Sequence, residues 1–273
     1  MIVVTGATGN VGRPLVTELA AAGERVTAVS RGAADVPEGV RHVRADLTDP
    51  AGLGPVFDGA DALFLLVSGE WLAAGGDPGG ILDAARAGGV KRVVHLSSQG
   101  VATRRHPPEL ERAVERSGLG WTMLRPSGFH SNTFGWAGTI RARRTAAAPF
   151  ADVALPTVDP ADIAAVAAVA LRDARHDGAV YELTGPEPVS PRQQVAAIAD
   201  ALGEPVRFVE QSREEARAQL LGFMPEPVVE ATLGILGSPL PAERRVSPDV
   251  ERLLGRPARD FAGWAVRNAR AFR

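Results

Sequence analysis

Three glycines follow the apolar run Ile2-Val3-Val4 at intervals of three residues, in the turn Gly6-Ala7-Thr8-Gly9-Asn10-Val11-Gly12. The run is predicted to be a strand and the residues after the turn a helix, which is the context that gives this spacing meaning. Gly6 permits a tight turn, Gly9 lets the backbone approach a pyrophosphate, and Gly12 allows close helix–strand packing. The helix start adds N–H groups and a positive dipole end. A turn without a ligand is the alternative. The predicted dinucleotide-binding residues are Gly6, Thr8, Gly9, Asn10, Val11 and Gly12.

The end of the second predicted strand indicates which dinucleotide binds. An NAD-binding protein usually carries Asp or Glu there, whereas this chain has Ser30-Arg31-Gly32. A carboxylate would repel a 2′-phosphate, but a guanidinium pairs with one through charge-assisted hydrogen bonds. We therefore predict that Arg31 selects NADP(H) over NAD(H). The alternative is that Arg31 stacks on adenine or lies in water.

Two further strand ends are predicted to contact the cofactor, because ligands of such sheets bind beyond the carboxyl ends of the strands. Asp46 and Leu47 follow the third strand, where a side chain can reach the adenine amino group and an apolar residue can pack on the ring. Val67 and Ser68 follow the fourth strand, near the place where the cofactor should cross the sheet.

Strands and helices alternate through the first half of the chain. Short apolar runs predict strands, and the segments between them predict helices; the strands are 2–4, 25–30, 40–44, 62–67, 92–97 and 121–125, and the helices 14–22, 79–87 and 108–116. The run 62–67 is apolar throughout, as a strand buried on both faces requires. This alternation predicts an α/β fold with a Rossmann, doubly wound parallel sheet.

The pattern loosens after residue 126, where a linker-like stretch over 146–156 precedes an alanine-rich helix over 162–172. We predict an NADP-binding Rossmann domain over 1–130, completed by about 151–176. A small C-terminal α/β substrate lobe is predicted over 177–273, together with the loop region 131–150.

Composition excludes several classes of protein. The 273 residues carry a net charge of −2 and no cysteine, and 45% of them are hydrophobic. This balance favours neither nucleic acid nor a membrane as a partner, and it excludes thiolate metal sites and cysteine nucleophiles. No spacing of His, Asp and Glu suggests a metal site. We expect a cytoplasmic protein with a small-molecule substrate, and a homodimer is left open.

Several motifs resemble the NmrA-like family of atypical short-chain dehydrogenases/reductases, which includes the type 2 quinone oxidoreductases. They are the glycine turn, Arg31, and the segments 90–98, 117–126, 158–163 and 181–187. The resemblance implies NADPH binding. It also leaves the activity open, because some members reduce quinones or related conjugated molecules and others sense the cofactor without evident catalysis.

The superfamily's catalytic Tyr-x-x-x-Lys pair is absent, because Tyr181 is the single tyrosine and Lys91 the only lysine. The resemblance places Ser97 and Ser98 where the superfamily's catalytic serine lies. Reduction of an isolated ketone forms an alkoxide, which needs an acid or an oxyanion donor. A quinone or an enone spreads the incoming charge, so we predict a conjugated acceptor.

Residues past the sixth strand are predicted to face the substrate. His130 lies on a loop expected to face the nicotinamide, and an imidazole could protonate the product. A loop histidine that only contacts substrate or solvent is the alternative. The predicted catalytic residues are His130, Ser97 and Ser98, and the predicted substrate residues are Phe129, His130, Asn132 and Trp136. Core packing of the lobe is an equal alternative for the aromatic residues.

Three functions follow from these observations. The first is an NADPH-dependent oxidoreductase that reduces a quinone-like or other conjugated small molecule. The second is a non-catalytic, NADP-sensing regulatory protein that acts through a partner. The third is a ketoreductase or epimerase in which the acid has moved elsewhere. The first is our working prediction.

Overall fold

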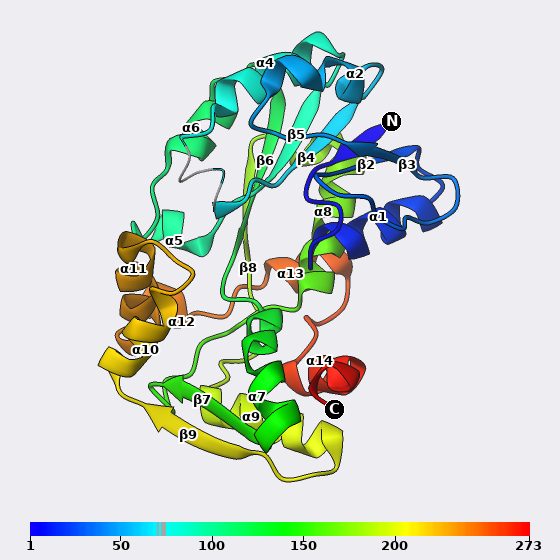
Figure 1. Cartoon of the computed structure of the whole chain (residues 1–273). Helices are drawn as coiled ribbons and strands as arrows, with labels where there is room; N and C mark the ends of the chain where they lie inside the picture. Colours follow the sequence, from blue (N-terminus) through cyan, green and yellow to red (C-terminus); the bar gives the residue numbers. More distant parts are fainter. Residues whose placement is uncertain (70, 72–74) are drawn as a thin grey trace. The chain divides into compact units, whose positions relative to one another are not determined.

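A computed structural model describes residues 1–69, 71 and 75–273 of the chain. The chain forms two compact units, and each of them gathers segments that are far apart in the sequence (Figure 1). The first unit consists of Met1–Ser98, Pro107–Pro126 and Pro160–Glu182. The second consists of Gln99–His106, Ser127–Asp159 and Leu183–Arg273.

The first unit is built on a seven-stranded sheet with the order β3-β2-β1-β4-β5-β6-β8. The strands are β1 (Ile2–Val4), β2 (Val26–Ser30), β3 (Arg41–Arg44), β4 (Ala62–Leu65), β5 (Arg92–Leu96), β6 (Gly120–Pro126) and β8 (Ala179–Leu183). All pairings from β3 through β6 are parallel. The order reverses between β1 and β4, so the carboxyl ends of these two strands mark the point where such sheets bind ligands. The predicted doubly wound α/β fold is confirmed.

Helices cover both faces of this sheet (Figure 1). They are α1 (Gly12–Ala21) and α8 (Pro160–Arg172), which contact each other, and α2 (Gly54–Phe57), α4 (Pro78–Ala87) and α6 (Glu109–Glu115), with the short η1 (Pro50–Leu53) and η3 (Ala174–His176). Strand β4 is buried along its whole length, because apolar side chains meet helices on either side. A core cluster that includes Phe57, Leu63 and Met123 fixes the sheet under α4 and α6.

The second unit has its own small sheet, in which β7 (Thr145–Pro149) pairs in parallel with β9 (Arg207–Gln211). Its helices are α5 (Gln99–Ala102), η2 (His130–Trp136), α7 (Ala137–Arg143), α9 (Pro191–Leu202), α10 (Arg213–Leu220), α11 (Glu226–Gly237), α12 (Pro241–Arg244), α13 (Asp249–Leu254), α14 (Phe261–Asn268) and η4 (Ala269–Phe272). Helices α9 and α14 pack around a core that includes Ile198, Trp264 and Phe272.

Two expectations about the chain's middle part are corrected. The region 131–150 was expected to be a loop and 146–156 a linker, but η2, α7 and β7 fill most of this stretch. The alanines at 146 and 148 are buried in β7, which pairs with β9. The unit boundaries also differ: 151–159 belongs to the second unit, and 177–182 to the first.

Candidate cofactor site

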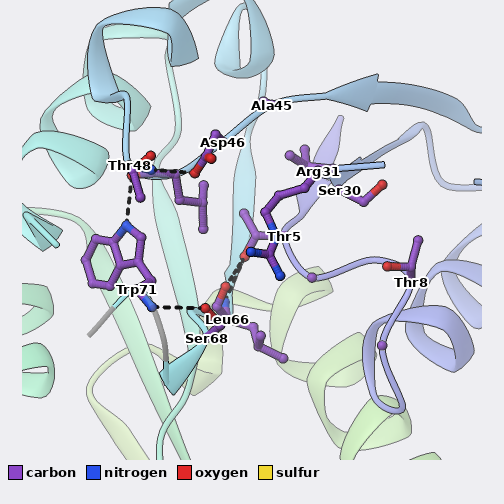
Figure 2. A pocket seen from close by; sticks show the side chains of 14 residues that line it. Thr5, Thr8, Ser30, Arg31, Ala45, Asp46, Thr48, Leu66, Ser68 and Trp71 are labelled. Carbon is purple, nitrogen blue, oxygen red and sulfur yellow. Dashed lines mark hydrogen bonds between the residues drawn. The ribbon is translucent and has the colours of Figure 1, made fainter. Parts of the chain in front are cut away.

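A pocket of about 390 Å³ opens in the first unit, at the end of the sheet where β1, β2 and β4 end (Figure 2). Its volume lies in the range of small-molecule sites. The lining residues are Thr5, Gly6, Thr8, Gly9, Val29, Ser30, Arg31, Ala45, Asp46, Leu47, Thr48, Leu66, Ser68 and Trp71. They come from the first glycine turn and from the segments that follow β2, β3 and β4.

The glycine turn has the close contacts that its sequence predicts. Gly6 has a φ of +62°, and a Cβ there would lie 2.8 Å from Leu66 Cδ2. A Cβ on Gly12 would lie 2.2 Å from the carbonyl oxygen of Gly6. Gly12 tolerates no side chain because its Cβ would meet the backbone of Gly6 and Ala7, and Gly6 is favoured by its left-handed backbone conformation.

The N-terminus of α1 has no side-chain cap. The N-cap residue is Val11, whose side chain makes no capping hydrogen bond, and no acidic residue lies in the first turn. Most helices use Ser, Thr, Asp or Asn at this position. A bound anion can take that role, since helix N–H groups and the helix dipole both favour negative charge. A pyrophosphate fits this end of the pocket.

Thr5 connects the ends of β1 and β4, the two strands between which the strand order reverses. Its hydroxyl lies 3.0 Å from the Phe64 carbonyl and 2.9 Å from the Leu66 carbonyl, and it accepts a 2.8 Å hydrogen bond from the Leu66 N–H. Figure 2 shows this bond on the pocket wall. Thr5 is buried, so the bonds hold the floor of the pocket rather than offering a group to a ligand.

Arg31 and Asp46 place opposite charges at the pocket. The Arg31 side chain extends into the pocket, and Asp46 lies beside Thr48 (Figure 2). The Thr48 N–H donates a 2.9 Å bond to Asp46. This backbone bond, the Thr48 hydroxyl and the Arg31 charge together lower the pKa of Asp46. Asp46 is thus an acceptor at neutral pH, as recognition of an adenine amino group requires.

Trp71 is a pocket residue that the sequence did not indicate. Its indole N–H donates a 2.9 Å hydrogen bond to the Leu47 carbonyl, and its backbone N–H donates to the Ser68 hydroxyl at 3.1 Å. It therefore connects the segment after β4 to the segment after β3, and both segments line the pocket (Figure 2). A tryptophan three residues past a predicted pocket residue was the only available signal.

Most of the predicted cofactor residues lie together. The ones that line the pocket are Gly6, Thr8, Gly9, Arg31, Asp46, Leu47 and Ser68. The others do not line it: Val11 and Gly12 are buried at the start of α1, Asn10 is exposed, and Val67 is partly buried against the core. Sequence reasoning missed Ser30 and Thr48, because their roles depend on how β2 and β3 end.

The ends of β5 and β6 carry a different arrangement. The Ser97 hydroxyl donates to Glu111, and Arg125 donates to both carboxylate oxygens of Glu111, at 2.9 and 2.6 Å. Glu111 is 4% exposed. Its burial alone would raise its pKa, but the bonds from Arg125 and Ser97 outweigh burial and lower the pKa. The Ser97 hydroxyl therefore donates its hydrogen bond to a carboxylate that stays ionised.

The single tyrosine and the only lysine of the chain are engaged elsewhere. The Tyr181 hydroxyl lies 2.8 Å from His176 Nδ1, and Lys91 Nζ lies 3.8 Å from an Asp61 carboxylate oxygen. Tyr181 lies in β8, at the edge of the sheet, and Lys91 lies directly before β5. They do not form a catalytic pair.

The predicted substrate residues belong to the second unit. His130 was expected on a loop that faces the nicotinamide. It is 1% exposed in η2, with Nδ1 at 2.9 Å from the Thr157 hydroxyl and edge-on to Phe261. Aromatic side chains pack around it, so it is not a solvated loop histidine. Trp136 packs against the core of this unit, Phe129 is partly buried, and Asn132 is exposed.

The described residues lack two further kinds of feature. No group of three or more His, Asp and Glu side chains is arranged to hold a metal ion within 1–69, 71 and 75–273. Over the same residues, no helix combines the length and the apolar character needed to cross a membrane.

Known proteins match this chain over most of its length. A family model described as NAD(P)H-binding matches residues 6–174. A (4-alkanoyl-5-oxo-2,5-dihydrofuran-3-yl)methyl phosphate reductase of Streptomyces griseus is 39% identical, covering 100% of this chain and 99% of the relative. An NAD(P)H azoreductase of Xenophilus azovorans is 32% identical with the same coverage, 100% and 99%. The fold is also that of an NADPH-dependent quinone oxidoreductase from Escherichia coli, with a TM-score of 0.81 at 24% identity over 98% of this chain and 99% of that one.

The chain belongs to this NAD(P)H-binding family. The matched segment includes the glycine turn, Arg31 and the strand ends that line the pocket. The protein is an NAD(P)H-dependent oxidoreductase.

Proposed function

We propose that this oxidoreductase uses NADPH in preference to NADH and reduces a conjugated small molecule such as a quinone. The position of Arg31 supports the cofactor preference. The engagement of Tyr181 supports the substrate class, and it is the observation on which the substrate proposal chiefly rests.

The pocket fits the phosphorylated cofactor. The N-terminus of α1 has no side-chain cap, which suits a pyrophosphate, and Asp46 and Leu47 suit an adenine. Arg31 extends from the end of β2 into the pocket, where a dinucleotide's adenosine ribose is expected. A guanidinium there would bind a 2′-phosphate with two parallel hydrogen bonds.

Tyr181 and Ser97 are not available as proton donors, which favours a substrate that delocalises the negative charge it gains with the hydride. When bound, the nicotinamide cofactor supplies the hydride. Tyr181 bonds His176, and Ser97 bonds an ionised Glu111, so Ser97 could not lose its proton without placing an alkoxide beside a carboxylate. A quinone, enone or azo compound spreads the added charge, and water then supplies the proton that completes the reduction.

The names of the relatives agree with this substrate class. The Streptomyces relative is named for a dihydrofuran whose ring double bond lies beside an oxo and an alkanoyl group. The Xenophilus relative is named for azo reduction, and another relative, 26% identical over 81% of this chain, is named quinone oxidoreductase 2. Each name describes an acceptor or a bond that belongs to a conjugated system.

The proposal can be tested with a panel of substrates, in which turnover is measured as the decrease in NADPH absorbance. The panel pairs a benzoquinone with cyclohexanone, an enone with its saturated ketone, and an azo dye with its hydrazo form. We expect turnover with at least one conjugated member, none with its saturated partner, and a lower KM for NADPH than for NADH. Fast reduction of the saturated ketones with no reduction of the conjugated members would contradict the proposed substrate class.

A further inference from the structure

The turn that carries Arg31 is bridged by the residue before it. The Ser30 hydroxyl donates a 2.8 Å hydrogen bond to the carbonyl of Gly32. This bond joins the residues on either side of Arg31, so it restrains the backbone from which the arginine side chain extends. Both Ser30 and Arg31 line the cofactor pocket.

A histidine on the neighbouring strand holds the same hydroxyl. His42 Nε2 lies 2.8 Å from the Ser30 oxygen. Because the hydroxyl hydrogen of Ser30 is directed to Gly32, Nε2 must carry the hydrogen of this second bond and donate it. His42 lies in β3, which runs parallel to β2 in the register Ala28–His42. A chain of donors thus runs from β3 through Ser30 to the turn.

Packing does little to hold this turn in place. Arg31 and Gly32 are exposed, and a Cβ on Gly32 would meet no atom within 4 Å among the residues that the structure describes. The β2–β3 ladder also stops here: the Ala45 N–H bonds the Ser30 carbonyl at 3.2 Å, and β2 ends at Ser30. The two side-chain bonds therefore restrain the backbone from which Arg31 leaves the sheet.

We propose that Ser30 and His42 are positioning residues that set the preference of this protein for a 2′-phosphorylated cofactor, by holding Arg31 toward the phosphate. The inference rests on the proposed preference for NADPH. A held arginine loses less conformational freedom when it binds, so its bonds to the phosphate yield more affinity. Neither Ser30 nor His42 needs to touch the phosphate.

Two fragments of the cofactor isolate this effect. 2′,5′-ADP and 5′-AMP differ only in the 2′-phosphate, and calorimetry gives the dissociation constant of each without any turnover. The dissociation constant of 5′-AMP divided by that of 2′,5′-ADP measures recognition of the 2′-phosphate, and a larger ratio means stronger recognition. A residue that only supports the fold would weaken both ligands equally and leave the ratio unchanged.

At each of the two positions, one variant removes the hydrogen-bonding group and the other keeps it. His42→Leu removes the donor, and His42→Gln keeps an N–H at the reach of Nε2. Ser30→Ala removes the hydroxyl, and Ser30→Thr keeps it. We expect His42→Leu and Ser30→Ala to reduce the ratio about five- to tenfold, which is the effect of one to two ordinary hydrogen bonds. His42→Gln and Ser30→Thr should keep the wild-type ratio, and 5′-AMP should bind the wild type and the two His42 variants alike, because His42 does not line the pocket.

A double variant tests whether His42 acts through Arg31. Arg31→Ala should abolish the preference, and His42→Leu should then have no further effect on the ratio. An equal loss for both ligands in His42→Leu, or additive losses in the double variant, would overturn the positioning role while leaving the NADPH preference intact. A wild-type protein that binds both fragments equally would overturn the preference itself, and the positioning role with it.

Discussion

At the ends of β1, β2 and β4 the polar groups surround an open pocket, whereas at the ends of β5 and β6 they bind one another. In the first region the start of α1 has no side-chain cap and Arg31 extends into the cavity. In the second, Ser97 and Arg125 bind Glu111, which is almost completely buried. Both regions lie at the carboxyl ends of parallel strands in the same sheet.

The difference separates binding from stability within one fold. Polar groups that bond each other contribute to the folded state, and groups that remain around a cavity are available to a ligand. A substitution at β5 and β6 should therefore lower the free energy of unfolding and leave cofactor affinity alone. A substitution around the pocket should do the reverse.

Glu111→Gln gives the largest expected effect. It leaves Arg125, whose side chain is 22% exposed, without its carboxylate. Breaking a buried pair on one side destabilises strongly, so we expect a loss of about 2–4 kcal/mol in the free energy of unfolding, measured with urea. The affinity of the folded variant for NADPH should stay within about twofold, because Glu111 does not line the pocket.

Acid provides an independent measure of the same carboxylate. The pKa of Glu111 is lower in the folded protein than its ordinary value of 4.5. The unfolded state therefore binds a proton first, and the stability from this group is complete above pH 4.5 and falls as the pH drops below it. Urea titrations between pH 6 and 3.5 should show a shallower decline for Glu111→Gln than for the wild type. Parallel curves would mean that Glu111 does not contribute in this way.

Arg31→Ala should reverse the pattern. Arg31 is exposed, so unfolding should change by no more than about 0.5 kcal/mol. If it binds the 2′-phosphate, NADPH affinity should fall about 10- to 100-fold and NADH affinity should not change. Binding of each cofactor can be followed by its fluorescence. Arg31→Lys is the matched control, since it keeps the charge without the two-pronged geometry, and it should recover only part of the affinity. Equal losses for both cofactors would assign Arg31 to the adenine or the pyrophosphate.

The sequence was sufficient where local pattern determines structure. The glycine spacing, the alternation of strands and helices, and Arg31 after β2 depend on neighbouring residues, and they led to the fold and to half of the pocket. What was missed depends on contacts between distant segments. The Trp71 side chain bonds Leu47 in another loop, and the His42 side chain bonds Ser30 in the neighbouring strand.

The same limit explains the expectations that were corrected. The sequence placed His130 on a loop and gave no sign of its burial, because the residues that enclose it, Phe261 and Trp264, are more than 100 positions away in the sequence. The stretch over 146–156 appeared to be a linker, because alanines carry little strand signal and the partner strand β9 follows much later. Periodicity does not report which distant segment will cover a residue.

Trp71→Phe tests the pocket wall with a smaller expected effect. Phenylalanine keeps an aromatic ring but lacks the N–H that bonds the Leu47 carbonyl. Loss of one hydrogen bond at the wall should weaken NADPH and NADH equally, by about threefold to tenfold. Nicotinamide mononucleotide, which lacks the adenosine half, should bind as it does to the wild type. A selective loss of nicotinamide mononucleotide would instead place Trp71 at the other end of the cofactor.

Ser97→Ala should have the smallest effect, and it tests the comparison most sharply. The family resemblance predicts a catalytic serine at this position. The hydrogen bond from its hydroxyl to Glu111 instead indicates a structural role. Glu111 keeps both bonds from Arg125 in the variant, so unfolding should lose only about 1 kcal/mol. The turnover number with NADPH and the preferred quinone should stay within about twofold, because a hydroxyl committed to a carboxylate is not an acid in the reaction. A fall of about 100-fold in turnover with unchanged stability would show that the ends of β5 and β6 serve catalysis after all, and that mutual bonding between polar groups does not distinguish the two regions.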